Sequence, residues 1–406
     1  MSNVVRVTLP NPTGGFYDAS TDTDLDHFSL YSDLDNVLIK RAFTGLGHVA
    51  VAGGSGYTVD TIAHNLGYIP FFTVYANFID LTGDNEKLLN NQSNPFSVPS
   101  AIASADVNNL YIYNFQATTL PYAYDIFYDD MSQTGNPQIV ESESVFKVAR
   151  PGKSALSKNP NDYIMHSDLN TFKILKQTTL ASHALSSGLN TIAHGANIDS
   201  DYRQFIFIKF PDGKTTILGS AASYSFDETK WAIASMDGTN IYIYASSAYT
   251  VDITYIIYGT GVAGDIPLSQ NVLGIAKSGK DILTTTDPEE TTFYSTLPTL
   301  KYYVSDTYNM GAVTNATTQT IAHNLGYVPF FICFVNDYTN FVANGYCIAP
   351  YYEGRSTSTN PTQDISAQVY ADSTNLYLKA LYQTNASGTS RTFNWYYKLF
   401  KNSLGL

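Results

Sequence analysis

Apolar and polar residues alternate with a period of two along most of this chain, which is the pattern of β-strands with one buried face. No stretch keeps a 3.6-residue apolar period for more than one turn, so the sequence predicts an all-β fold. Gly-, Asn- and Pro-rich segments separate the alternating runs. In the first third, the pattern predicts strands at Gly47–Ala52, Tyr57–His64, Phe71–Ile79, Val98–Ala105, Leu110–Gln116 and Tyr122–Tyr128.

One string of letters recurs along the chain. Thr-Ile-Ala-His-Asn-Leu-Gly-Tyr occupies positions 61–68 and returns unchanged at 320–327, and its first four letters also stand at 191–194. His194 follows His64 by 130 positions, and His323 follows His194 by 129. Recurrence at a nearly fixed offset indicates copies of one structural unit.

Two further patterns accompany each histidine. A Ser-containing turn that ends in a short alternating strand precedes it, at 30–40, 165–174 and 293–302. The pattern Asp-x-x-Asn-(Leu/Ile)-Tyr follows it, and Asp and Asn are residues that bond local backbone in turns. Its Asp and Asn members are Asp106, Asn109, Asp237, Asn240, Asp372 and Asn375.

The copies divide the 406 residues into near-equal thirds. Six or seven strands in about 130 residues suit one compact antiparallel sandwich. We therefore predict three tandem antiparallel β-sandwich domains, at 1–138, 139–268 and 269–406, with the lead-in segments as linkers or edge strands. The first domain would begin with an extended N-terminal segment.

We interpret the repeated histidine motif as a device of backbone geometry. His64 ends a predicted strand, Gly67 can adopt a positive φ without steric cost, and Pro70 removes a ladder donor before the next strand. The residues of this structural motif are Thr61, His64, Gly67, Tyr68, Pro70, Thr191, His194, Thr320, His323, Gly326, Tyr327 and Pro329.

A metal site is the alternative role for the histidines. Zinc needs three or four converging ligands, and no copy supplies a second His or Cys at ligand spacing. A metal would need the same histidine from three chains meeting on one axis. The second copy keeps His194 but replaces the following turn by other letters at 195–200. A turn can be rebuilt in this way, so we favour the structural role.

Candidate catalytic groups do not follow the repeat. The acidic pairs Asp129-Asp130 and Glu289-Glu290 occur once each, and the sequence has no nucleophile elbow, phosphate loop or HExxH string. The alternating aspartates Asp22 to Asp26 could hold calcium, but they lack the Gly and terminal Glu of a calcium loop. We favour a solvated acidic loop there and expect no enzyme activity, cofactor or metal.

Charge and composition limit the partners. Only 14 % of residues are charged and the net charge is −13, which argues against nucleic acid and anionic membranes. No apolar run approaches the roughly 20 residues that span a bilayer, and the first residues show no secretory signal. For Cys333 and Cys347 we favour buried small apolar residues over a disulfide bridge.

Tyrosine is abundant, with 32 residues. Those on alternating strands can face outward and form contact surfaces, because tyrosine buries area while keeping a polar tip. Packing between sheets or chains is the alternative. The candidates for a contact surface are Tyr111, Tyr113, Tyr242, Tyr244 and Tyr377.

The full unit resembles repeats in structural proteins of tailed bacteriophages, among them tail, fibre and minor virion proteins. The resemblance rests on the basic turns at 150–152 and 277–281, on Phe172-Lys173-Ile174 and Leu300-Lys301-Tyr302, and on the two complete histidine segments. It touches all three copies. The first copy departs from it, with Leu9-Pro10-Asn11-Pro12 where the basic turn should stand.

This resemblance implies a non-enzymatic virion component, with a tail fibre, spike or adaptor protein as the first expectation. A host-receptor protein that binds glycans and a head decoration or head fibre protein are the alternatives, and a depolymerase is a more remote one. The implied partners are other virion proteins and host-surface glycan, with a homo-oligomer, a trimer favoured. The implied location is the virion, after synthesis in the host cytoplasm.

Overall fold

The structure is a computed structural model of all 406 residues. It describes residues 6–8, 28–31, 40–50, 57–80, 83–88, 92–93, 99–128, 146–149, 153–154, 156–157, 162–166, 169, 172, 174–195, 202–220, 223–259, 273–276, 291–294, 299–300, 302–336, 345–357, 360–383 and 390–406.

Strands dominate the described residues, and nearly all of their pairs are antiparallel, so the predicted all-β class is confirmed. No helix in this part of the chain is long and apolar enough to cross a membrane. We call the copies repeats 1, 2 and 3. The strands of repeat 1 are β3 (Lys40–Val49), β4 (Thr58–Ala63), β5 (Phe71–Asp80), β6 (Gly83–Leu88), β7 (Gln92–Ser93), β8 (Pro99–Ala105), β9 (Asn109–Asn114) and β10 (Leu120–Tyr128).

Repeats 2 and 3 contain matching strands in the same order. In repeat 2 these are β13 (Ile174–Leu185), β14 (Gly188–Ala193), β15 (Tyr202–Lys209), β16 (Thr215–Leu218), β17 (Ser223–Tyr224), β18 (Trp231–Met236), β19 (Asn240–Ala245) and β20 (Tyr249–Gly259). In repeat 3 they are β23 (Tyr302–Val313), β24 (Thr317–Ala322), β25 (Pro329–Asn336), β26 (Tyr346–Ala349), β27 (Tyr351–Thr357), β28 (Asn360–Ala371), β29 (Asn375–Gln383) and β30 (Arg391–Ser403).

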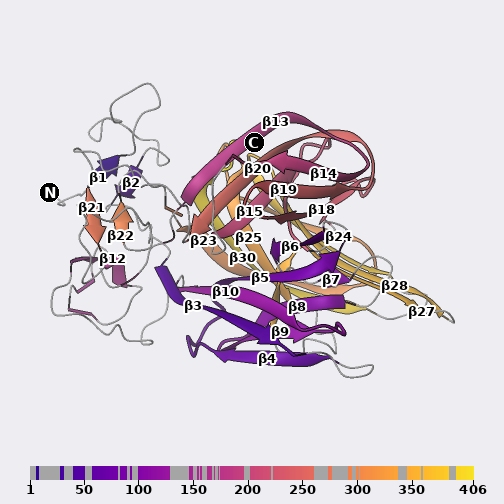
Figure 1. Ribbon diagram of the computed structural model, residues 1–406, viewed down its shortest axis with the longest axis horizontal. Coiled ribbons are helices and arrows are strands. Elements are labelled where there is room, and N and C mark those ends of the chain that lie inside the picture. Colours follow the sequence, from indigo (N-terminus) through magenta and orange to yellow (C-terminus); the bar gives the residue numbers. More distant parts are fainter. Residues whose placement is uncertain are drawn as a thin grey trace.

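Each repeat also begins with a separate two-stranded antiparallel sheet. The pairs are β1 (Arg6–Thr8) with β2 (Phe28–Tyr31), β11 (Lys147–Ala149) with β12 (Tyr163–His166), and β21 (Gly274–Ala276) with β22 (Thr291–Tyr294). We call these pairs the lead-in hairpins. Figure 1 shows their labelled strands at one end of the molecule, beside the N-terminus and apart from the longer strands. The lead-in segments predicted from the sequence, at 30–40, 165–174 and 293–302, begin within the second strands of these hairpins and end at the first residues of β3, β13 and β23.

Two groups of strands form within each repeat. In repeat 2, β13, β20, β15 and β16 pair in that order, while β14, β19 and β18 pair in a second group. One apolar cluster joins residues of both groups, including Ile206 and Ile253 from the first and Ile241 and Ile243 from the second. The two groups therefore pack face to face around a core of their own.

The sheets do not stop at the repeat boundaries. At each boundary a strand of one repeat, β6, β16 or β26, pairs with a strand of the next repeat, β18, β28 or β8. The register partners are Glu86 with Met236, Thr215 with Ala371, and Tyr346 with Ala105. These pairs link repeat 1 to repeat 2, repeat 2 to repeat 3, and repeat 3 back to repeat 1, so the pairing runs in a closed cycle.

A shared aromatic core lies where the three repeats meet. The ring of Phe205 lies 6.4 Å from that of Phe71 and 5.0 Å from that of Phe330, each from a different repeat. Phe400 contacts Phe71 at 5.9 Å and Phe330 at 5.1 Å. All four side chains are fully buried and belong to the same apolar cluster. Their burial stabilises the association of the repeats, because each buried aromatic side chain removes a large apolar area from water.

The six strands predicted for the first third all exist, with ends shifted by up to seven residues. The strand β6 was not predicted, because its letters Gly-Asp-Asn-Glu-Lys-Leu have the composition of a loop. The predicted domain boundaries, at 138 and 268, lie outside the described residues, as does the acidic segment Asp22–Asp26. Three separate sandwich domains remain a prediction, since the sheets cross from repeat to repeat.

Candidate functional site

The repeated histidine connects two turns in every repeat. It follows the strands β4, β14 and β24 directly, and its backbone amide donates a hydrogen bond to a carbonyl of the Asp-x-x-Asn turn. The pairs are His64 with Asn108 (2.8 Å), His194 with Thr239 (3.1 Å) and His323 with Thr374 (2.8 Å). All three imidazoles are at most 3 % exposed.

The side chain of His323 fixes its own tautomer. Its Nδ1 accepts a hydrogen bond from the amide of Leu325 at 3.2 Å, so the ring proton lies on Nε2. Nε2 then donates to the carbonyl of Asp372 at 3.0 Å. His194 makes the same contact with the carbonyl of Asp237 at 3.1 Å, and in repeat 1 the amide of Leu66 donates to Nδ1 of His64 at 3.2 Å.

Burial lowers the pKa of these three histidines below the ordinary value, although nearby carbonyls and carboxylates oppose the shift. The neutral ring is the form that can accept from an amide and donate to a carbonyl at once. The two contacts of His323 therefore hold its imidazole as a neutral structural group.

The turn after the histidine uses positive φ angles, as its glycine predicted. Asn65 and Gly67 have φ values of 51° and 78°, and Asn324 and Gly326 have 55° and 80°. In repeat 2, Gly195 has a φ of 62°, and residues 196–201 of this turn lie outside the described residues. Gly and Asn adopt the left-handed backbone conformation at the lowest energetic cost, which explains why these residues occur at these positions.

The Asp-x-x-Asn pattern caps the facing turn. In repeat 3, one carboxylate oxygen of Asp372 accepts from the amides of Thr374 (2.9 Å) and Asn375 (2.8 Å). The other accepts from the hydroxyl of Tyr377 at 2.7 Å. Asp106 and Asp237 make the equivalent contacts in their repeats.

The tyrosines of this pattern were predicted as a contact surface, but their hydroxyl groups have partners inside the repeat. Tyr111, Tyr242 and Tyr377 each donate to the aspartate five positions earlier, at 2.7 to 2.8 Å. Each ring stays partly exposed. A ligand would meet the faces and edges of these rings rather than a free hydroxyl.

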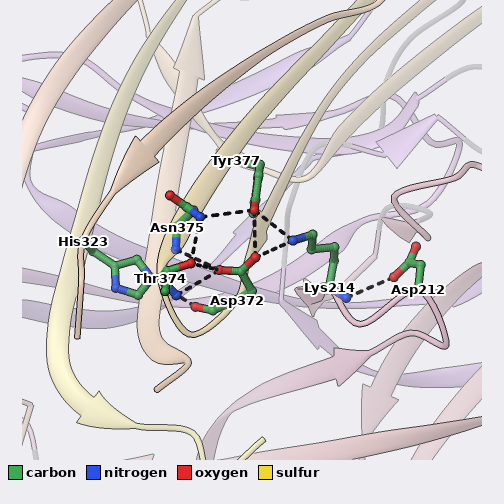
Figure 2. A network of polar contacts seen from close by, with 7 residues as sticks. All are labelled: Asp212, Lys214, His323, Asp372, Thr374, Asn375 and Tyr377. Atoms are coloured by element: carbon green, nitrogen blue, oxygen red, sulfur yellow. Dashed lines mark hydrogen bonds and ion pairs between the residues drawn. The ribbon is translucent and has the colours of Figure 1, made fainter. Parts of the chain in front are cut away.

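Repeat 3 adds a cation to this cap, and the cation comes from repeat 2. Figure 2 shows Lys214, from the turn before β16, reaching the carboxylate of Asp372 and the hydroxyl of Tyr377. Its ammonium makes an ion pair with Asp372, bonds to Tyr377 at 2.8 Å, and lies 4.1 Å from the ring centroid. Asp212 accepts from the backbone amide of Lys214 at 3.0 Å and holds the turn.

The contacts in this cluster shift the pKa values of both charged groups. Burial lowers the pKa of Lys214, but the hydrogen bonds to Asp372 and Tyr377 outweigh it and raise the pKa above its usual value. Burial likewise opposes ionisation of Asp372, yet the bonds from Lys214 and from nearby amides lower the pKa of this carboxyl well below the ordinary range. The pair is therefore charged at neutral pH and joins two repeats.

A second contact strengthens the same boundary. Phe226 of repeat 2 packs against Tyr370 and Tyr377 of repeat 3, with ring centroids 5.2 and 5.5 Å apart. Lys379 lies over the Phe226 ring at 5.0 Å and makes an ion pair with Glu228 at 2.6 Å. A loop of one repeat thus covers the outer face of the next.

The remaining tyrosines of the predicted contact surface belong to aromatic groups. Tyr113 lies 5.4 Å from Tyr57 and 6.5 Å from Phe115, and Tyr57 is 46 % exposed. Tyr244 stacks on Trp231 at 5.8 Å with an interplanar angle of 19°. In repeat 1 only Tyr57 of this group is exposed, while Tyr113 and Phe115 are partly buried and pack against Ile102 and against Cys347 of repeat 3.

The other predicted motif residues have structural positions. Thr61, Thr191 and Thr320 are exposed on their strands. Tyr68 and both prolines, Pro70 and Pro329, are buried. The hydroxyl of Tyr327 donates to the carbonyl of Lys401 at 2.7 Å.

Cys333 and Cys347 are buried thiols on the neighbouring strands β25 and β26, with no bond between them. Burial raises the pKa of Cys333 well above the ordinary value. Within the described residues, no group of three or more His, Cys, Asp or Glu side chains could hold a metal ion. The three motif histidines are each held in their own turn.

Sequence reasoning did not find the residues that join repeats 2 and 3. Lys214, Phe226 and Lys379 have no repeated counterpart in the printed letters, so the period that identified the histidines gives no signal for them. Their roles depend on which strand edges meet, and only the fold supplies that.

Comparison with protein-family models, with curated proteins and with solved structures finds no match for this chain.

Proposed function

We propose that this chain is a non-enzymatic structural protein of a tailed bacteriophage virion, located in the tail as a fibre, spike or adaptor component. The carrying observation is the closed cycle of strand pairing. Each repeat pairs with the next one, and the partner residue in that next repeat lies directly before the Asp-x-x-Asn turn of that repeat. A chain that builds three linked units with equivalent surfaces suits mechanical connection better than a single reactive centre.

The polar residues of the repeated motifs support this proposal. His323 bonds backbone groups of two turns, Asp372 caps one of these turns, and Lys214 ties that turn to the preceding repeat. Their hydrogen-bonding atoms face protein groups. On this proposal, the residues that recur in the three repeats define the conformation of the turns and do not catalyse a reaction.

We further propose that each repeat is a β-sandwich unit and that the three units surround an approximate threefold axis. Repeat 2 has its own two-layer core, and the aromatic core joins Phe71, Phe205 and Phe330 from different repeats. The resemblance to phage proteins implied a homo-oligomer, with a trimer favoured. The closed cycle supplies a threefold arrangement within a single chain, so we now favour a monomer, which a solution mass measurement would distinguish from a trimer.

The proposal is tested on purified particles of the virus that encodes the chain. Particles banded in a density gradient should contain the chain in a fixed ratio to the major capsid protein, and antibody labelling should mark the tail. Labelling of the head would favour the head decoration or head fibre alternative. A chain that remains entirely in the unbanded lysate would contradict a structural role.

Host glycan binding is a second candidate function, favoured by the exposed ring of Tyr57 in repeat 1. A sugar face can stack on this ring, and the partly buried rings of Tyr113 and Phe115 lie next to it. On this proposal, purified chain competes with virus adsorption, and Tyr57→Ala with Tyr113→Ala removes the competition. Unaltered adsorption in saturating wild-type chain would exclude it, and reducing ends released from host polysaccharide would indicate a depolymerase instead.

A further inference from the structure

The three lead-in hairpins are built alike. Their first strands begin at Arg6, Lys147 and Gly274, and each pairs with the second strand in the same register, with a bulge after the second pair. The residue opposite each first position is aromatic or imidazole: Tyr31, His166 or Tyr294. The hairpins are therefore structural repeats in their own right, as the sandwich strands are.

The hairpins of repeats 2 and 3 pack together. Met165 and Phe293, at most 1 % exposed, form a small apolar cluster with Val148 and Ile275. Met165 pairs with Val148 in one hairpin, and Phe293 pairs with Ile275 in the other, so equivalent positions of two repeats meet. This cluster is separate from the large core of the longer strands.

Short connections fix the hairpins to the sandwich strands. Phe172, between β12 and β13, and Leu300, between β22 and β23, are 3 % and 0 % exposed and belong to the large shared core. Phe172 stacks on Tyr258 with the ring centroids 4.3 Å apart. Phe172 and Leu300 thus place a residue of each connection in the same core.

Large apolar side chains remain exposed at matching positions of this end. Phe146 directly precedes β11 and is 50 % exposed, and Leu273 directly precedes β21 and is 46 % exposed. They are 127 positions apart, as are the first residues of the two hairpins. In repeat 1 the sequence has Val5 at the corresponding position, which lies outside the described residues.

We propose that the hairpin end is a docking surface for a virion protein with threefold symmetry, and that Phe146 and Leu273 are equivalent anchors on it. The surface continues an interface that already joins two repeats, and its anchors repeat with the chain. Equivalent anchors can be filled together only by a partner that presents the same apolar pocket several times around its own axis. This inference rests on the proposed virion function.

A photo-crosslinking amino acid placed at 146, at 273 or at 189 tests the inference in assembled particles. Leu189 is a matched control, because it is 50 % exposed but lies on β14, among the sandwich strands. The expected result is that positions 146 and 273 link to the same peptide of one other polypeptide, while position 189 does not. Identical targets follow from threefold symmetry, because each anchor then meets the same surface.

Different outcomes separate the two proposals. Particles that lack the chain overturn the proposed function, and this inference with it. Particles that contain the chain overturn the inference alone if positions 146 and 273 link to different peptides, to this chain itself or to nothing.

A second variant measures the anchors without a crosslinker. Phe146→Ser combined with Leu273→Ser should lower incorporation into particles about tenfold or more, since central apolar anchors dominate the energy of docking surfaces. Leu189→Ser should leave incorporation unchanged. Equal incorporation of the double variant and the control, at equal thermal midpoints, would overturn the anchor role.

Discussion

At the residue scale, His323 shows why an imidazole recurs in this chain. One ring nitrogen accepts from the amide of Leu325 and the other donates to the carbonyl of Asp372, across 49 positions of sequence. A neutral imidazole offers one donor and one acceptor on opposite sides of a rigid ring. Few other side chains can join an amide and a carbonyl in this way.

Replacing His323 by alanine should destabilise the protein. The variant leaves the partly buried amide of Leu325 and the partly buried carbonyl of Asp372 without these partners, and such losses cost about 1–3 kcal/mol each at most. Chemical denaturation followed by tyrosine and tryptophan fluorescence measures the change. Thr320→Ala, at an exposed position of the same motif, is the control and should change the free energy of unfolding by less than about 0.5 kcal/mol.

The motif histidines should also make stability depend on pH. Burial lowers their pKa in the folded state, so the unfolded chain binds protons first as the pH falls through about 6.5. Their contribution is complete above that value and is lost progressively below it. Thermal midpoints measured from pH 7.5 to 5.0 should fall, with a shallower slope for His323→Gln. Equal slopes for the two proteins would contradict this.

Much of this local chemistry was predictable from the letters. The positive φ of Gly67 and the capping by Asp106 follow from what Gly and Asp do in any turn. The bonding of the Tyr111 hydroxyl to Asp106 was not predicted, because strand alternation gives the direction of a side chain but not its partner. The role of Lys214 was not predictable for the same reason.

At the element scale, the decisive event is the pairing of a short strand in one repeat with the next repeat. In β16, Thr215 pairs with Ala371 of β28. Lys214, which directly precedes Thr215, makes an ion pair with Asp372, which directly follows Ala371. Backbone pairing and an ion pair thus fall at one place. A period-two pattern predicts that such strands exist, but it does not say which edges meet.

Lys214→Met should weaken the contact between repeats 2 and 3. The substitution leaves the partly buried Asp372 carboxylate without its cation, and losing a hydrogen bond to a charged group costs about 1.5–3 kcal/mol. Differential scanning calorimetry or denaturant titration gives the change. The control is Lys209→Met, whose more exposed ion pair with Asp252 lies within repeat 2, and which should cost less than about 1 kcal/mol.

The Asp372→Asn variant separates the ion pair from other effects of removing the lysine. If Lys214 acts through Asp372, the loss in the double variant is smaller than the sum of the two single losses. If the two losses of stability are additive, Lys214 stabilises the protein through contacts other than the one with Asp372.

At the scale of the whole molecule, three copies of one unit close upon each other. The repeat itself was evident from the histidine spacing and from the three Asp-x-x-Asn patterns. The closure was not, because a tandem repeat is equally compatible with a straight rod, an arc or a ring. The shared aromatic core around Phe71, Phe205 and Phe330 explains the preference, since a rod would leave these side chains exposed to water.

The contact that closes the cycle, between repeat 3 and repeat 1, can be tested with one new cysteine. Ser104 of β8 and Cys347 of β26 are register partners, although 243 positions separate them in sequence. Partners in an antiparallel pair have Cα atoms about 4.5–5.5 Å apart, which a disulfide can bridge. Ser104→Cys with Cys347→Ala is the control that cannot form this bond.

Under mild oxidation, Ser104→Cys should form a disulfide with Cys347 within one chain, seen by mass spectrometry as a linked peptide in the monomeric fraction. Such a bond can form only if the third repeat returns to the first. If the two cysteines remain reduced, or pair only between different chains, the closed cycle of repeats within a single chain is wrong.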